Sequence, residues 1–178
     1  MLEGKKVYLI KIQHNSLEEI RKWRNKSEIK QYIRQYNDIN QEEQEKWYNN
    51  NVINTDTQFN FEIRLKEGNK LIGQCGLNNI SWINRSAEFS IIIGYSEFRG
   101  YGYGSDAIRI LIKYGFEELN LIRIHCEVFE NNPGACKLYK YLGFKEEGCM
   151  RQSYFNSGKY WDTYILSMLK SEYSLETD

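Results

Sequence analysis

The sequence has very little proline, no excess of either charge and no long apolar run. Pro133 is the only proline among 178 residues, and no stretch rich in proline, glycine and serine marks a linker. Lys and Arg together number 24, as do Asp and Glu, so the net charge is zero. Because a basic surplus is typical of proteins that bind nucleic acid or anionic membranes, we expect neither partner.

Cysteine and histidine are too few and too scattered for a metal site or a disulfide framework. The cysteines stand at Cys75, Cys126, Cys136 and Cys149. None forms a C-x-x-C pair, and there are only two histidines. Unpaired thiols are typical of a reducing cytoplasm. We therefore expect no metal, a cytoplasmic location, and cysteines that serve as small buried apolar residues.

No segment has the length or composition of a targeting or membrane-spanning element. Apolar runs fall well short of the roughly 20 residues that a transmembrane helix needs. The first six residues are charged and lead into a short alternating stretch, unlike a signal peptide. Aromatic residues make up 15% of the chain, which favours an ordered globular protein. We predict a single domain over residues 1–178, large enough to bury a core unaided.

Hydrophobic periodicity predicts a chain in which helices alternate with strands. Strands are expected at 7–12, 58–66, 70–78, 86–93, 121–129 and 144–149, with a final hairpin that turns at 156–159. Helices are expected from Ser16, over 27–36, from Asn40 to Tyr48, over 103–118, and from Pro133 to Leu142. Ser16 with Glu19 forms a capping-box pattern, and Asn132 with Pro133 is a strong helix start. This order predicts an α/β fold with a mixed sheet and helices on its faces.

The most informative segment is a glycine-rich loop between an apolar strand and a helix. Gly100, Gly102 and Gly104 leave the main chain bare, so several N–H groups can converge on one anion. The following helix adds free N–H groups and the positive end of its dipole. The spacing G-x-G-x-G is not a Rossmann fingerprint, and no Gly-Lys-Ser/Thr of a P-loop follows. We predict a site for the pyrophosphate of a cofactor, with a ligand-free structural turn as the alternative.

Three motifs in this order and spacing resemble the GNAT superfamily of acetyl-CoA-dependent N-acetyltransferases. In chain order they are Arg85-Ser86-Ala87-Glu88-Phe89, then Arg99-Gly100-Tyr101-Gly102-Tyr103-Gly104, then Asn132-Pro133-Gly134-Ala135 with the following Leu138-Tyr139-Lys140-Tyr141-Leu142-Gly143-Phe144. The chain is most similar to the bacterial branch of ribosomal-protein-alanine, spermidine and amino-sugar acetyltransferases. The resemblance implies the acyl-CoA N-acyltransferase fold, a central mixed β-sheet with helices on both faces. It also implies acceptor-side helices at about 16–52 and an acetyl-CoA-binding core at about 82–165.

The resemblance further implies which residues bind the cofactor. Main-chain groups of one strand would pair with the pantetheine arm, loop amides would hold the pyrophosphate, and an asparagine would face the cofactor. These residues are Ile91, Ile92, Ile93, Arg99, Gly100, Tyr101, Gly102, Tyr103, Gly104, Ser105 and Asn132. Tyr139 would stand near the thioester sulfur.

Acetyl transfer to an amine also needs a proton acceptor and a proton donor. An alkylamine has a pKa near 10 and must lose a proton, which Glu88 could relay directly or through water. A main-chain N–H of residues 91–93 can stabilise the developing oxyanion. Tyr139 can protonate the leaving thiol, because their ordinary pKa values of about 10 and about 8.5 are close. No side-chain nucleophile is required.

Each candidate side chain also has a purely structural interpretation. Tyr139 can be a core tyrosine, and Glu88 can be an outward-facing residue, since its apolar neighbours share the opposite face of the strand. We expect His125 to be a structural histidine rather than a base. Arg24 can be a substrate clamp or a surface salt bridge.

The sequence thus predicts an N-acetyltransferase that moves acetyl directly from acetyl-CoA to a primary amine. The acceptor would be a small molecule, either an amino sugar or a polyamine, or a protein N-terminus. The alternative is a non-catalytic acyl-CoA-binding module used for sensing or assembly. The resemblance also allows a homodimer.

Overall fold

An eight-stranded sheet organises residues 1–174, the part of the chain that this computed structural model describes. The strands are β1 (Leu2–Glu3), β2 (Val7–Lys11), β3 (Phe59–Leu65), β4 (Leu71–Ser81), β5 (Ser86–Ile93), β6 (Arg123–Phe129), β7 (Lys145–Asn156) and β8 (Lys159–Leu169). They lie in the order β1-β2-β3-β4-β5-β6-β8-β7. All neighbours are antiparallel except β5 and β6, which are parallel. The predicted mixed sheet is therefore confirmed.

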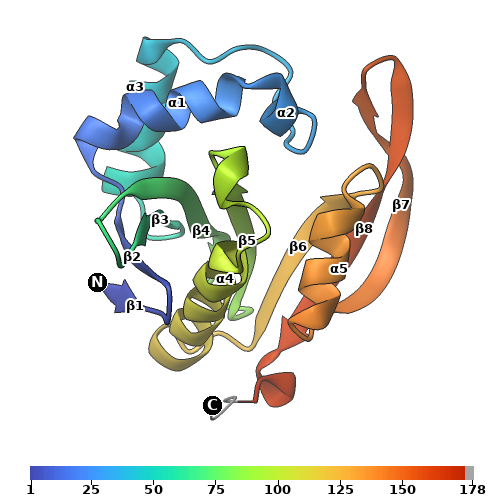
Figure 1. Ribbon diagram of the computed structural model, residues 1–178. Helices are drawn as coiled ribbons and strands as arrows, with labels where there is room; N and C mark the ends of the chain where they lie inside the picture. Colours follow the sequence, from blue (N-terminus) through green and yellow to red (C-terminus); the bar gives the residue numbers. More distant parts are fainter. Residues whose placement is uncertain (175–178) are drawn as a thin grey trace.

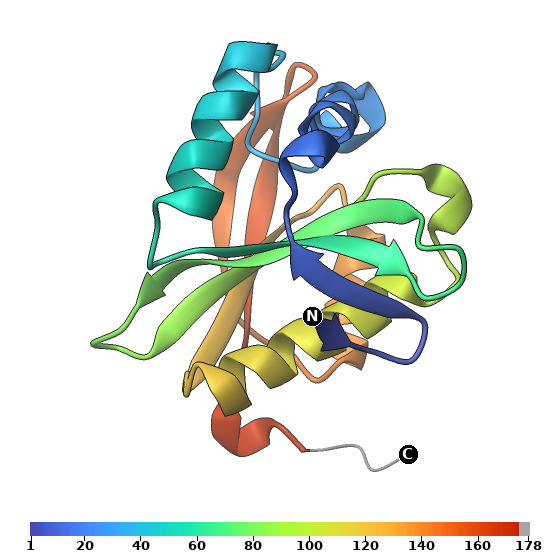
Figure 2. The ribbon, with the colours of Figure 1, turned by 90° about the vertical axis from the view of Figure 1, so that its left-hand side faces the viewer.

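Helices cover both faces of this sheet, as predicted. They are α1 (Leu17–Asn25), α2 (Ser27–Lys30), α3 (Gln41–Tyr48), α4 (Tyr103–Lys113) and α5 (Pro133–Tyr141). Single 3₁₀ or π turns lie at His14–Ser16, Asn49–Ile53, Ser96–Phe98, Tyr114–Glu118 and Lys170–Glu172. Figure 2 shows α4 on one side of β2–β5 and α1 and α3 on the other. Within residues 1–174, none of the helices combines the length and apolar character that crossing a membrane requires.

Alternating side chains of β5 serve two separate apolar cores. Ala87 and Phe89 are buried in the larger core, which also contains the apolar faces of α4 and α5. Ile92 packs instead against a smaller core beneath α1 and α3, which includes Ile20 and Trp23. Because successive strand residues point to opposite faces, β5 is the layer that both cores share.

β5 and β6 are paired only where they begin. Their parallel register joins Ser86 to Arg123, Ala87 to Ile124 and Glu88 to His125. Beyond these pairs β5 continues its ladder with β4 as far as Ile93, and the described residues give it no further partner on the β6 side. Figure 1 shows β5 and β6 moving apart toward α1 and α2, with α4 and α5 flanking them. The second half of β5 thus has one unpaired edge inside the molecule.

Helix α1 and its C-terminal end are anchored at the end of β5. The ring of Trp23 is fully buried over Gly94, where a Cβ would lie 2.1 Å from Trp23 Cδ2. The next residue, Tyr95, contacts Trp23 edge to face at 5.4 Å and donates a hydrogen bond of 2.6 Å to Glu19 Oε1. Lys26 Nζ donates to the Gly94 carbonyl at 3.2 Å. The close approach of Trp23 explains why position 94 is glycine.

Two predicted helix starts are confirmed by their caps. Asn40 accepts a hydrogen bond from the Glu43 N–H in a complete capping box, and Asn132 accepts one from the Ala135 N–H. Gly143 terminates the last helix with φ +97°, as expected for a glycine at this position.

Three local predictions are wrong. Ser16 makes no side-chain cap, because the preceding 3₁₀ turn places it at φ −92° and ψ −9° rather than in the extended conformation that a cap needs. The helix expected over 27–36 ends at Lys30, where a turn replaces it. Cys149 is exposed rather than buried. Cys75 and Cys126 are buried as expected, and Cys136 is half-buried.

Replacing Gly94 by Ala should lower the free energy of unfolding by about 1–3 kcal/mol, because the added methyl overlaps the Trp23 ring. Urea denaturation would measure this change. Gly148→Ala is the matched control, since a Cβ there meets no atom within 4 Å and should cost about 0.5 kcal/mol or less. Equal losses in both variants would contradict the packing argument.

Candidate active site

The unpaired edge of β5 offers main-chain groups to a ligand. The Gly94 N–H donates to Ile72 of β4, so alternate residues up the ladder, including Ile92, direct their main-chain groups toward β4. Ile91 and Ile93 accordingly direct theirs toward the gap in the ladder. The Ile93 carbonyl accepts a hydrogen bond of 3.1 Å from Arg99 Nη2, which agrees with this direction.

The glycine loop leads into a helix N-terminus that no side chain caps. Gly100 and Gly102 adopt φ +84° and +83°, the left-handed region that glycine reaches without strain. Gly102 is the N-cap of α4 and has no side chain to satisfy the first N–H groups. A Cβ at Gly100 would meet nothing within 4 Å, and one at Gly104 would lie 3.9 Å from Ile91 Cδ1. The loop therefore has the bare main chain and the space that a pyrophosphate needs.

The side chain of Arg99 extends from the loop toward α2. Its Nη2 lies 3.3 Å from Glu28 Oε1 of α2, in addition to the bond with Ile93. The predicted role of Arg99 in binding the pyrophosphate therefore belongs to its main chain rather than to its guanidinium.

The N-terminal segment contacts the same loop, a feature that the motifs did not indicate. The Asp106 carboxylate, in the first turn of α4, accepts hydrogen bonds from the N–H groups of Lys5, Lys6 and Val7 at 3.0, 2.7 and 2.9 Å. Lys6 Nζ also donates to the Tyr101 carbonyl at 2.8 Å. These partners lie about a hundred residues apart in the sequence, so no local pattern could have linked them.

Tyr139 is buried on the side of the sheet that faces α4 and α5. It is 8% exposed, and its ring meets Phe89 of β5 edge to face at 4.9 Å. Burial raises the pKa of its phenol above the ordinary value, so the hydroxyl keeps its proton at neutral pH. Asn132 uses its side-chain oxygen to cap α5 and thereby fixes the start of the helix that carries Tyr139.

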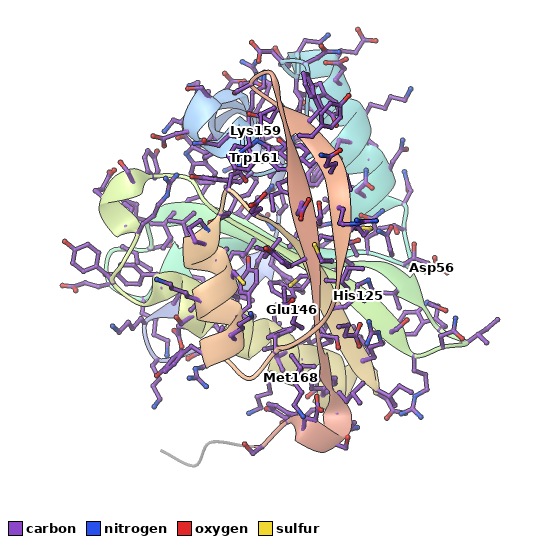
Figure 3. The ribbon with its side chains drawn as sticks, turned by 90° about the vertical axis from the view of Figure 1, so that its right-hand side faces the viewer. Asp56, His125, Glu146, Lys159, Trp161 and Met168 are labelled. Carbon is purple, nitrogen blue, oxygen red and sulfur yellow. The ribbon has the colours of Figure 1, made fainter. Side chains whose placement is uncertain are left out.

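Glu88 and His125 stand side by side on the opposite face, at the last pair before β5 and β6 separate. Glu88 Oε2 accepts a hydrogen bond of 3.0 Å from Asn79 Nδ2. His125 Nδ1 is buried and has no partner among the described residues. Figure 3 shows His125 on the side of β7 and β8 away from α5, whereas Glu146 lies on the α5 side. The register between β5 and β6, which the sequence alone does not give, brings Glu88 and His125 together.

The segment between α2 and α3 is held against β6 and β7. Arg34 lies 2.8 Å from Glu127 Oε2, donates to the Ser153 carbonyl at 3.1 Å, and covers the Phe129 ring at 5.0 Å. Arg24 forms no salt bridge with the described residues; its guanidinium lies over the Trp47 ring at 5.6 Å, and its role as a substrate clamp stays a prediction.

Several buried side-chain polar atoms have no hydrogen-bond partner within residues 1–174. The acceptors are Gln35 Oε1, Gln44 Oε1, Gln74 Oε1 and Asn131 Oδ1, the donors are Trp23 Nε1, Gln44 Nε2 and Trp161 Nε1, and His125 Nδ1 can act as either. Gln74 pairs with Ile92 in the ladder, and Asn131 binds the Gln31 carbonyl through its Nδ2 at 3.2 Å. Because buried polar atoms normally have a hydrogen-bond partner, water or a ligand is expected to complete these groups. Within the same residues, no three His, Cys, Asp or Glu side chains gather as metal ligands would.

Comparison with known proteins finds acetyltransferases. Residues 6–145 match the family model described as an acetyltransferase (GNAT) domain. A spermidine N(1)-acetyltransferase of Vibrio cholerae is 38% identical over 133 residues, which are 74% of this chain and 75% of that protein. An uncharacterized N-acetyltransferase of Bacillus licheniformis, p20, is 40% identical over 114 residues, and the match spans 64% of each chain.

Solved structures agree with these matches. The crystal structure of spermidine N-acetyltransferase from Vibrio cholerae in complex with CoA and spermine has a TM-score of 0.88 to this chain at 32% identity. The superposition covers 93% of this chain and 96% of that one.

Substitutions at Gly104 test the loop as a CoA site. A Cβ there faces Ile91 and Ile93 without overlap, so Gly104→Ala should leave CoA affinity within about threefold of the wild type. Gly104→Val adds two methyl groups between α4 and the free edge of β5 and should weaken CoA binding about tenfold or more. Isothermal titration calorimetry would measure both. Position 104 is preferable to Gly102, whose φ of +83° would strain any valine. Wild-type affinity in Gly104→Val would count against the assignment.

Proposed function

The chain belongs to the GNAT family of acetyltransferases, and from this membership we propose that it transfers acetyl from acetyl-CoA to a primary amine of a linear polyamine. The family match and the superposition confirm the predictions of family, fold and enzyme class. The acceptor and the roles of individual residues are the substance of the proposal.

Residues of β5, α4 and the loop between them hold acetyl-CoA, which supplies a thioester carbonyl that an amine can attack. The main-chain groups of Ile91 and the N–H of Ile93 pair with the pantetheine arm, while the Ile93 carbonyl already accepts a hydrogen bond from Arg99. N–H groups of residues 99–105 and the dipole of α4 bind the pyrophosphate. The open space at Gly100 and the uncapped start of α4 support this arrangement.

Glu88 and His125 receive the proton that the amine must lose. Both lie on the face of the sheet that carries Ile92 and the acceptor-side helices, rather than on the face of α4 and α5. Glu88 accepts the proton directly or through a water molecule. The unpartnered His125 Nδ1 beside it is a second acceptor for the same proton or water.

Tyr139 supplies a proton to the departing sulfur. A phenol is protonated at neutral pH, and burial raises the pKa of Tyr139 further, which makes it a weaker acid than in water. Its ring lies against β5 at Phe89, two residues before Ile91. A thiolate held in the same apolar surroundings is also a stronger base than in water, which brings the two pKa values closer together.

A polyamine is the acceptor class that the relatives favour, and their similarity carries the choice. Within residues 1–174, the buried oxygens of Gln35, Gln74 and Asn131 that lack a donor are compatible with a ligand that brings N–H groups. A polyamine has several N–H groups spaced by methylenes, so one molecule can serve more than one of them. The related Vibrio enzyme is named for spermidine, and its structure contains spermine.

An acceptor panel tests this assignment. Release of free CoA from acetyl-CoA would be followed with spermidine, spermine, glucosamine and an alanyl peptide. Turnover with the polyamines is the expected result. Turnover with glucosamine alone would make the acceptor an amino sugar, and turnover with the peptide alone would make it a protein N-terminus. Tight acetyl-CoA binding without turnover on any amine would favour the non-catalytic module instead.

Self-association is part of the same proposal. A structure of the Vibrio relative is described as dodecameric. The homodimer allowed by the family resemblance stays a prediction for this chain, as does a location in the cytoplasm.

Tyr139→Phe should lower kcat about 10²-fold or more, because it removes the proton donor and leaves the packing against Phe89 intact. The KM for acetyl-CoA should stay unchanged in the CoA-release assay. Tyr141→Phe is the matched control, since that side chain is 76% exposed and two residues further along. A fully active Tyr139→Phe enzyme would remove the tyrosine from the mechanism.

Glu88→Gln should lower kcat about 10²-fold at neutral pH while CoA affinity stays at the wild-type value. His125→Gln should have a smaller effect, since His125 is the second acceptor. Glu146→Gln, on the α5 side of the sheet, is the control and should be fully active. A larger loss in His125→Gln than in Glu88→Gln would make the histidine the base.

A further inference from the structure

One side chain outside the three motifs reaches the cofactor loop from the N-terminus of the chain. Lys6 Nζ donates to the Tyr101 carbonyl at 2.8 Å and lies 3.4 Å from the point that a Cβ on Gly102 would occupy. Tyr101 and Gly102 are the centre of the glycine loop, directly before α4. The ammonium group of Lys6 is therefore part of the loop's immediate surroundings.

Asp106 fixes the main chain that carries Lys6. Both of its carboxylate oxygens accept N–H groups of the N-terminal segment, Oδ1 from Lys5 and Oδ2 from Lys6 and Val7. The acidic side chain is thus directed away from the first N–H groups of α4, where its charge would repel a phosphate. The same three bonds hold the backbone of Lys6 against the first turn of α4.

The bond from Lys6 sets the direction of one peptide unit. The chain contains no cis peptide within its described residues, so the carbonyl of Tyr101 and the N–H of Gly102 point in opposite directions. With the carbonyl bound to Lys6, the Gly102 N–H points away from Lys6. Reversing this peptide changes ψ of Tyr101 and φ of Gly102, and glycine tolerates a wide range of φ, so the flip is sterically accessible without the lysine.

We propose that Lys6 is a positioning residue for the pyrophosphate of CoA: it orients the Gly102 N–H for the phosphate and adds one positive charge behind the loop. This inference rests on the proposed function of the loop. Arg99 does not supply that charge, because its guanidinium is engaged by Glu28 and Ile93.

The test compares Lys6→Met with Lys6→Arg by calorimetric titration with CoA. Lys6→Met should weaken CoA binding about tenfold, the loss expected when one hydrogen bond to a charged group, that of the Gly102 N–H to the phosphate, is no longer pre-oriented. Lys6→Arg keeps a charged donor and should recover most of the affinity. In turnover, Lys6→Met should raise the KM for acetyl-CoA and leave kcat and the KM for the amine unchanged.

S-acetylpantetheine separates positioning of the pyrophosphate from a general structural effect. This donor carries the thioester but no pyrophosphate, so kcat/KM with it should be the same in Lys6→Met and in the wild type. Lys66→Met is the control, because Lys66 pairs with Glu3 and its main chain adjoins Lys6 in the same region. It should bind CoA normally.

Two results would overturn the inference: wild-type CoA affinity in Lys6→Met, or an equal loss with CoA and with S-acetylpantetheine. Failure of the wild-type protein to bind CoA at all would instead refute the proposed function.

Discussion

The separation of β5 from β6 after three residue pairs is the constraint on which the site depends. A strand inside a sheet normally satisfies its main-chain groups on both sides, and here the second half of β5 does so only toward β4. Two helices flank the gap between these strands: α4 follows β5 and α5 follows β6. The Glu88–His125 pair is the last pair of the ladder, Tyr139 packs on the neighbouring Phe89, and the glycine loop follows the end of the unpaired half of β5. The main-chain groups on this open edge of β5 can pair with an extended ligand.

Much of the fold was predictable because its signals are local. The boundaries of β5 agree with the prediction, and Asn40 and Asn132 cap their helices through hydrogen bonds that span three residues. The cap predicted at Ser16 is absent because a 3₁₀ turn, which the periodicity did not reveal, alters the backbone before α1. Local patterns describe a cap correctly only when the conformation on its N-terminal side is also known.

The candidate site was predictable only in part, for the same reason. The loop glycines and Tyr139 belong to contiguous motifs, whereas the contact of Lys6 with Tyr101 joins opposite parts of the chain. The pairing of Glu88 with His125 depends on the register between strands that a whole helix separates. Such contacts follow from topology, and no spacing in the sequence encodes them.

The contact of Trp23 with Gly94 has a mechanical consequence. The indole lies so close to the main chain that α1 cannot slide or tilt over the end of β5 without separating the two. The short stretch after α2 differs, because single side-chain bonds, such as those of Arg34 to Glu127 and Ser153, hold it against the sheet. These bonds can break one at a time, so this stretch can shift while α1 keeps its place on β5.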